Sequence, residues 1–144
     1  SYLAQKMWFE KIQNDSNNIY LVIDTEDEKN IGLATIINID WKNRRAYHGI
    51  KIGESKNRGK GIGTDVVMAV MRYAFDELQL NRLDGSIMEG NKLSEKLYID
   101  KCGWKKEGKM RKYIFKRGKY YDLTWVGILK EEYYDTVKKL RYWE

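Results

Sequence analysis

The residues best placed to do chemistry form a glycine-rich stretch at positions 58–64, with the sequence RGKGIGT. It follows a strand-like run at residues 47–52 and precedes a helix-like run at residues 65–78. Glycines at alternate positions let the backbone bend freely and approach a ligand closely. Free N–H groups at the beginning of a helix favour an anion. With Arg58 and Lys60 beside these groups, the stretch predicts a site for phosphate or pyrophosphate.

The spacing of the glycines separates several kinds of phosphate-binding loop. The P-loop pattern fails because no lysine in the stretch is followed by Ser or Thr, and the dinucleotide pattern G-x-G-x-x-G fails at Thr64. The pattern [RQ]-x-x-G-x-[GA] fits, with Arg58, Gly61 and Gly63. A plain turn between a strand and a helix is the alternative interpretation of these residues.

Length and composition limit the class of protein. The 144 residues, 33% charged and 42% hydrophobic, predict one globular domain over residues 1–144, with neither a membrane span nor a signal peptide. A single cysteine, Cys102, and a single histidine, His48, make a disulfide framework and a metal site unexpected. The net charge is +6, with nine basic residues and one acid between residues 101 and 119. Nucleic acid, a solvated hairpin or a phosphate-rich coenzyme would each explain that excess.

The apolar pattern predicts a mixed α/β fold in which helices pack on a mixed sheet, in the order α-β-β-β-α-β-α-β-β. The expected strands cover residues 19–23, 31–39, 46–52, 82–88, 109–116 and 120–129. Strands 46–52 and 82–88 are joined through helix 65–78, so they should run parallel. The other expected helices begin the chain, follow Asn91 until Gly103, and cover residues 130–143.

A second motif follows the glycine-rich stretch: Asn91-x-x-Ser94-x-x-x-Tyr98, then Cys102-Gly103-Trp104 and Glu107-Gly108. The two motifs in this order resemble the GNAT superfamily of N-acetyltransferases. The hairpin and helix at residues 115–132 resemble the branch that contains ribosomal-protein alanine acetyltransferases and diamine acetyltransferases. One departure is that Gly103 is the fifth residue after Tyr98, whereas in family members the glycine is usually the fourth. The extra residue is expected to bulge the helix and turn Tyr98 from its usual position.

The resemblance implies a GNAT fold with a largely antiparallel sheet, in which the parallel strands 46–52 and 82–88 splay apart around acetyl-CoA. It also implies that one further strand and helix would precede Ser1. A backbone N–H near Ile52 would bond the thioester oxygen, and the glycine-rich backbone would hold the pyrophosphate. The residues expected to contact the coenzyme are Ile50, Ile52, Arg58, Gly59, Lys60, Gly61, Ile62, Gly63, Thr64, Asn91, Ser94 and Tyr98.

The resemblance makes Tyr98 the general acid for the coenzyme A sulfur, and packing within a helix is the alternative for this residue. The family's glutamate base falls at Ser86, which leaves Glu54 and Glu89 as candidate bases beside a water-mediated mechanism. His48 is expected to be a hydrogen-bonded histidine within the sheet. Asn91 would either approach the pantetheine arm or cap the following helix.

The leading hypothesis is a cytoplasmic, acetyl-CoA-dependent N-acetyltransferase that acts on a primary amine. Candidate acceptors are a protein N-terminus, a polyamine, an aminosugar or an antibiotic. The alternative is a non-catalytic acyl-CoA-binding or regulatory module, and a nucleic-acid-binding domain ranks last. No nucleic acid, membrane or metal is expected as a partner. A homodimer is possible through aromatic residues near the end of the chain that are expected to be exposed, namely Tyr133, Tyr134, Tyr142 and Trp143.

Overall fold

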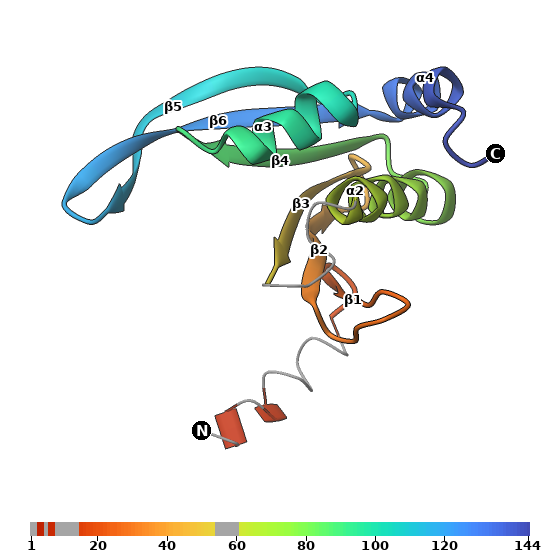
Figure 1. Ribbon diagram of the computed structural model, residues 1–144, viewed down its shortest axis with the longest axis horizontal. Helices are drawn as coiled ribbons and strands as arrows, with labels where there is room; N and C mark the ends of the chain where they lie inside the picture. The colour runs from red at the N-terminus through yellow and green to blue at the C-terminus, as the bar shows by residue number, and fades with distance from the viewer. Residues whose placement is uncertain (1–2, 5, 8–14, 54–60) are drawn as a thin grey trace.

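The computed structural model describes residues 3–4, 6–7, 15–53 and 61–144, and its main feature is one six-stranded sheet. The strand order is β1-β2-β3-β4-β6-β5 (Figure 1). Every neighbouring pair is antiparallel except β3 and β4, which are parallel. The predicted mixed, largely antiparallel sheet is therefore confirmed. Most of the predicted first helix lies outside the described residues.

The first three strands form two successive hairpins. They are β1 (Ile19–Ile23), β2 (Gly32–Asp40) and β3 (Arg45–Ile52). The predicted bounds differ from these by at most one residue, because alternating apolar side chains and acidic or amide-rich turns mark each strand clearly. One irregularity interrupts the β2–β3 register between Ile37 and Asp40.

Strands β3 and β4 (Arg82–Met88) pair over a short distance and then part. The paired positions are Arg45 with Arg82, Ala46 with Leu83 and Tyr47 with Asp84. Figure 1 shows the two strands diverging beyond this point. The predicted splay is present, and it opens a wedge whose root lies beside His48.

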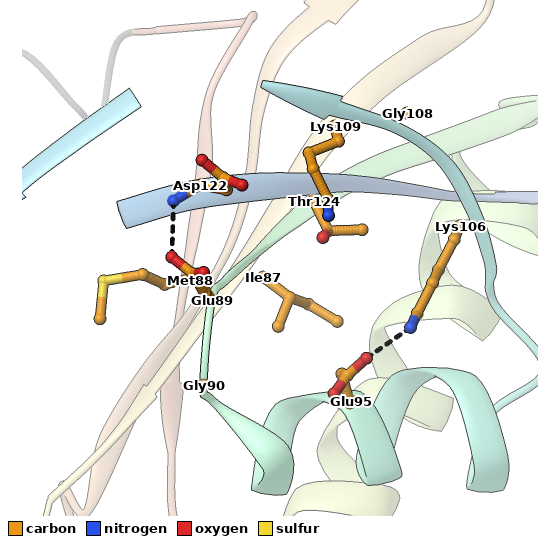
Figure 2. A pocket seen from close by; sticks show the side chains of 10 residues that line it. All are labelled: Ile87, Met88, Glu89, Gly90, Glu95, Lys106, Gly108, Lys109, Asp122 and Thr124. Carbon is orange, nitrogen blue, oxygen red and sulfur yellow. Dashed lines mark hydrogen bonds and ion pairs between the residues drawn. The ribbon is translucent and has the colours of Figure 1, made fainter. Parts of the chain in front are cut away.

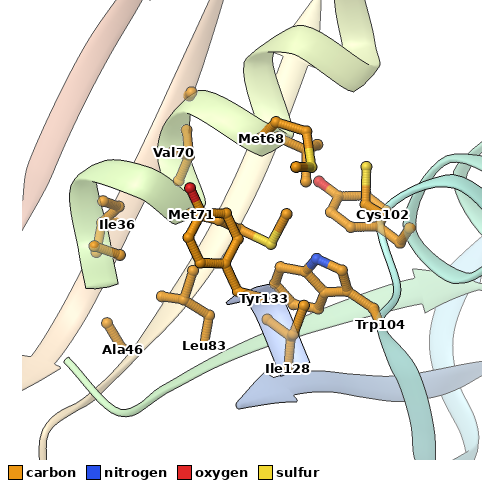
Figure 3. Close-up of a cluster of buried hydrophobic side chains, with 14 of the residues drawn as sticks. Ile36, Ala46, Met68, Val70, Met71, Leu83, Cys102, Trp104, Ile128 and Tyr133 are labelled. Atoms are coloured by element: carbon orange, nitrogen blue, oxygen red, sulfur yellow. The ribbon is translucent and has the colours of Figure 1, made fainter. Parts of the chain in front are cut away.

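Helix α2 (Ile62–Arg72) continues directly into the π-helix η1 (Tyr73–Glu77) and packs on the sheet. Its apolar side chains interlock with Ile36, Ala46, Leu83 and Ile128 in the main core (Figure 3). The helical spacing predicts an apolar face made of Val66, Val67, Val70, Met71, Ala74, Phe75 and Leu78. This face is largely confirmed, although Val66 and Leu78 are only half-buried, and Met68, which it does not include, is fully buried. The buried residues of α2 and η1 are Val67, Met68, Val70, Met71, Ala74 and Phe75.

The second motif forms one turn of α-helix, α3 (Lys92–Glu95), and then a π-helix, η2 (Lys96–Lys101). A π-helical turn takes up one more residue than an α-helical turn. The extra residue between Tyr98 and Gly103 is therefore absorbed here, as the expected bulge. Gly103 has φ +81° just after the helix ends, which fits the predicted glycine stop.

The last hairpin is longer than predicted and projects from the body of the molecule (Figure 1). It comprises β5 (Lys105–Lys116) and β6 (Lys119–Leu129), and the final helix is α4 (Lys130–Leu140). Strand β5 begins four residues before its predicted start, because the polar residues that precede position 109 pair with β6. Large exposed apolar side chains gather on this hairpin, namely Met110, Tyr113, Phe115 and Tyr120.

The helices α2, η2 and α4 share one core against one face of the sheet. Tyr133 of α4 lies in that core, 5.4 Å from Phe75 between ring centroids, so the expectation that Tyr133 is exposed was wrong. Tyr134 and Trp143 are exposed as expected. Within the part of the chain that the structure describes, no helix is long and apolar enough to cross a membrane.

Candidate active site

Where β4 has parted from β3, the N–H groups on that edge of β3 have no strand partner among the described residues. The Gly49 N–H donates to Thr35 Oγ1 at 3.1 Å, and the Gly53 N–H donates to the Ile31 carbonyl at 2.8 Å. Both of these bonds run toward the β2 side. Successive N–H groups of a strand point to opposite edges. The N–H groups of Ile50 and Ile52 therefore point to the β4 side of β3, where β4 no longer pairs with it. These are two residues that the sequence assigned to the coenzyme.

The beginning of α2 forms the second part of the site. Gly61 caps the helix with φ +80°, and a Cβ there would meet no atom within 4 Å. The first described bond of this helix is donated by the Asp65 N–H to the Gly61 carbonyl, so the N–H groups of Ile62 and Gly63 precede it. A Cβ at Gly63 would lie 3.2 Å from Leu97, so this glycine also permits close packing of α2 against η2.

Several predicted site residues cannot be compared with the structure. Arg58, Gly59, Lys60 and Glu54 lie outside the described residues. Of the glycine-rich stretch, the structure describes residues 61–64. Thr64 lies in the first turn of α2 and is half-buried.

Tyr98, the candidate acid, lies inside the protein rather than on its surface. Its side chain is 6% exposed, and its ring centroid lies 5.1 Å from that of Trp104. The hydroxyl lies 3.0 Å from Nε2 of His48. Burial raises the pKa of Tyr98 well above its ordinary value.

His48 is the hydrogen-bond partner of Tyr98, and the sequence did not predict this pair. Its Nδ1 lies 3.0 Å from the Thr35 carbonyl oxygen, which confirms the expected hydrogen-bonded histidine. The imidazole is 2% exposed, and burial lowers the pKa of His48 to about 4 although the bond to Thr35 opposes this change. The side chain is therefore neutral at pH 7. Because side chains alternate along β3, His48 faces the helices, and only the fold shows that it meets Tyr98.

Glu89, a candidate base, lies at the end of β4 and turns away from the wedge (Figure 2). Its carboxylate accepts the Asp122 N–H at 3.1 Å, and Asp122 belongs to β6, on the side of β4 opposite β3. Glu89 lines a cavity of about 530 Å³ between α3 and the last hairpin. Charged residues at its rim include Glu95 and Lys106, whose carboxylate and ammonium groups lie 2.5 Å apart.

The residues of the second motif have structural partners. The Asn91 side chain accepts a hydrogen bond from the Ser94 N–H at 3.1 Å. Asn91 therefore caps α3, which was one of the two roles predicted for it. Glu107 forms an ion pair with Arg82, which also binds Asp84 through a 2.7 Å hydrogen bond. These hydrogen bonds and charges raise the pKa of Arg82 and lower that of Glu107. This network fastens β4 to β5.

A polar and aromatic cluster lies on the face of the sheet opposite the helices. The hydroxyls of Tyr47 and Ser86 are in close contact, and the Tyr47 ring centroid lies 5.5 Å from that of Trp125. Tyr47 occupies the last paired position of β3, so the cluster stands at the root of the wedge. Ser86 takes the place at which some family members have a glutamate. The alternation of side chains along β3 and β4 was the signal that could have grouped these residues.

Buried groups elsewhere complete the chemical inventory. Cys102 is fully buried, and burial raises its pKa to about 12, which makes the thiol unreactive. Among the described residues, no group of His, Cys, Asp and Glu side chains is arranged to hold a metal ion.

The fold agrees with comparisons to known proteins. A family model described as "Acetyltransferase (GNAT) domain" matches residues 2–105. The solved structure of spermidine N-acetyltransferase from Vibrio cholerae in complex with CoA and spermine aligns with a TM-score of 0.85 at 25% identity, covering 93% of this chain and 78% of that one. The chain therefore belongs to the GNAT family of acetyltransferases and is an enzyme of the N-acetyltransferase class.

The relatives include a putative ribosomal N-acetyltransferase and a polyamine N-acetyltransferase. The putative ribosomal N-acetyltransferase YdaF of Bacillus subtilis is 34% identical over 102 residues, 71% of this chain and 55% of that protein. The spermidine N(1)-acetyltransferase of Vibrio cholerae is 26% identical over 125 residues, 87% of this chain and 71% of that protein. The prophage-derived N-acetyltransferase YokL of Bacillus subtilis is 29% identical over 126 residues, 88% of this chain and 70% of that protein.

Proposed function

We propose that the protein transfers an acetyl group from acetyl-CoA to a primary amine, by direct attack of the neutral amine on the thioester. The observation that carries this proposal is the parting of β3 and β4, which leaves the N–H groups of Ile50 and Ile52 facing the wedge. A thioester in that wedge would find donors already in place for the oxygen that gains negative charge. Such preorganised donors typically contribute about 3 kcal/mol to transition-state stabilisation.

The pyrophosphate of the coenzyme is assigned to the beginning of α2. The N–H groups of Ile62 and Gly63 have no earlier helical acceptor among the described residues, and the helix dipole favours an anion there. Arg58 and Lys60 would add positive charge from the part of the loop that precedes Gly61. Asn91 and Ser94 are assigned to the pantetheine arm through their place at the beginning of α3.

The proton balance needs one donor and one acceptor. Tyr98 is proposed to protonate the departing sulfur: its O–H bond breaks, an S–H bond forms, and the electron pair of the C–S bond stays on sulfur. The attacking nitrogen loses one proton, which restores Tyr98 by way of water or a base. Glu54 and Glu89 are the candidate bases, and Glu54 immediately follows β3 in sequence, whereas Glu89 turns toward β6.

The acceptor is proposed to enter over the cluster of Tyr47, Ser86 and Trp125. This cluster lies on the face of the sheet opposite α2, η2 and α4. Polyamines, protein N-termini, aminosugars and aminoglycoside antibiotics are the acceptor classes considered. The net charge of +6 opposes a polycation at long range, but the acidic turn at residues 24–28 could attract one. We also propose a cytoplasmic location, and a homodimer through the exposed aromatic residues Tyr134 and Trp143 near the end of the chain.

The experiment that tests the proposed function measures thiol release from acetyl-CoA across a panel of amines. The panel contains spermidine, an aminosugar, an aminoglycoside and a peptide with a free N-terminus. Turnover on one class, reduced about 100-fold by Tyr98→Phe, is the expected result, since general acid catalysis typically contributes 10²–10⁴-fold. Coenzyme binding without turnover on any amine would instead support the alternative, a non-catalytic acyl-CoA-binding module. Ser86 in place of a glutamate is the observation that favours this alternative.

The wedge-facing N–H group can be tested separately with proline. Ile52→Pro removes an N–H that makes no ladder bond, so the fold should tolerate it, whereas kcat/KM for acetyl-CoA should fall about 100-fold. Lys51→Pro is the matched control, because the Lys51 N–H points toward β2 and its loss should lower Tm more. Ile52→Ala reports how much the side chain alone contributes. Unchanged kcat/KM in a folded Ile52→Pro protein would contradict the assignment.

A further inference from the structure

The only histidine of the chain lies at the point where the sheet opens. His48 follows Tyr47, the last residue of β3 that pairs with β4. Its ring lies among those of Tyr98 and Trp104, at centroid distances of 5.7 and 5.9 Å. A fully buried polar side chain in such a position must satisfy both of its nitrogen atoms.

The hydrogen bonds of His48 determine which nitrogen carries the proton. A carbonyl oxygen only accepts, so Nδ1 must donate its hydrogen to the Thr35 carbonyl, 3.0 Å away. In a neutral imidazole the other nitrogen then carries a lone pair. Nε2 therefore accepts from the Tyr98 hydroxyl at 3.0 Å, and the single proton of that hydroxyl points at His48.

Tyr98 lies within the π-helix η2, the element that takes up the extra residue of the motif. Its phenol is buried between the rings of His48 and Trp104. The tyrosine of the motif and the histidine of β3 thus form one hydrogen-bonded unit at the root of the wedge.

We infer that His48 is a positioning residue for the reaction: its Nε2 atom holds the Tyr98 hydroxyl at the root of the wedge and orients its proton until the sulfur departs. This inference rests on the proposed function, because it takes Tyr98 as the proton donor. His48 itself neither gains nor loses a proton in the step. The hydroxyl turns from Nε2 to the sulfur, its O–H bond breaks and an S–H bond forms, and the proton released by the amine restores the phenol.

The kinetic test compares three variants of the whole chain. His48→Phe, which removes both nitrogens, should lower kcat about 10-fold and change KM for acetyl-CoA by less than about twofold, as expected for loss of a positioned acid. His48→Gln offers an acceptor near the Nε2 position and should restore kcat to within about threefold of the wild type. The double variant His48→Phe/Tyr98→Phe should be no slower than Tyr98→Phe alone. Ile128→Ala, which truncates a fully buried side chain away from His48 and Tyr98 in sequence, is the control for loss of stability.

Two kinetic results would overturn the inference. One is wild-type kcat in a folded His48→Phe protein. The other is a double variant slowed by the product of the two single effects, since independent residues act additively in free energy.

A spectroscopic test does not depend on turnover or on the stability of a His48 variant. Because His48 is the only histidine, ¹⁵N NMR of its ring at pH 7 is unambiguous. Nδ1 should be protonated, Nε2 should be unprotonated, and Tyr98→Phe should shift the Nε2 resonance while it leaves Nδ1 nearly unchanged. A proton on Nε2 would overturn the inference.

The two tests together distinguish failure of the inference from failure of the proposed function. If the wild type acetylates no amine while the NMR tautomer is as stated, the proposed function fails. The His48–Tyr98 contact is then part of the fold and not a catalytic device. If the wild type turns over and the NMR result is the opposite tautomer, only the inference fails.

Discussion

Acidification from pH 7 to pH 4 is expected to lower the free energy of unfolding by about 3 kcal/mol through His48 alone. Burial lowers the pKa of His48 from 6.5 to about 4 in the folded protein. Above pH 6.5 the imidazole is neutral in both states, and its contribution is fully present. Below that pH the unfolded chain binds a proton that the folded protein does not bind, so stability is lost as the pH falls toward the folded pKa.

Other groups titrate in the same range, so the prediction concerns a difference between two proteins. Glu107 also has a lowered pKa, because of its hydrogen bond to Arg82, and its effect appears in both proteins. The measurement is urea unfolding of the wild type and of His48→Gln at several pH values between 7 and 4. The stability of the wild type relative to the variant should decrease over this range. A difference that is independent of pH would show that His48 titrates normally in the folded state.

Gly103→Ala is expected to lower the free energy of unfolding by about 2–5 kcal/mol. The residue has φ +81°, which costs a residue with a Cβ about 1–2 kcal/mol. The added Cβ would also lie only 2.3 Å from Oγ1 of Thr136 on α4, and such overpacking costs about 1–3 kcal/mol. The position therefore combines a backbone requirement with a close approach between η2 and α4.

Gly118→Ala is the matched control for this prediction. Gly118 has φ +75° in the turn of the last hairpin, but nothing lies within 4 Å of a Cβ there. Gly118→Ala should therefore lower the free energy of unfolding by only about 1–2 kcal/mol, the cost of a positive φ for a residue with a Cβ. Thr136→Ala should recover part of the loss in Gly103→Ala by removing the atoms that clash. Equal losses at the two glycines, measured by urea unfolding, would refute the steric part of the argument.

Much of the fold was predictable from local pattern. The alternation in β1, β2 and β3 predicted these strands with nearly their observed bounds, whereas the helix predicted from residue 65 begins three residues earlier, at Ile62. The glycine-rich stretch and the Asn91–Tyr98 motif indicated the family, and the crossover through α2 predicted that β3 and β4 run parallel. Each of these is a property of neighbouring residues, which is what a sequence records directly.

The failures share a physical cause. The prediction for strand β5 was too short because the first residues of this strand are polar. They form a strand because they pair with β6, and not because they are buried. Tyr133 was expected on the surface, because a polar helix gives little sign of one tyrosine that packs on Phe75. In both cases a partner distant in sequence decides the outcome.

For the site, the sequence by itself indicated the candidate residues: the glycines at the beginning of α2, Tyr98, and Ser86 at the place of the missing glutamate. It also indicated the extra residue before Gly103. Only the tertiary structure decided that this residue forms a π-helix, that Tyr98 is buried, and that its hydroxyl meets His48. These two residues are fifty positions apart, and nothing in either local segment specifies their contact. Their meeting depends on how η2 packs over the point where β3 leaves β4, which is set by the core as a whole.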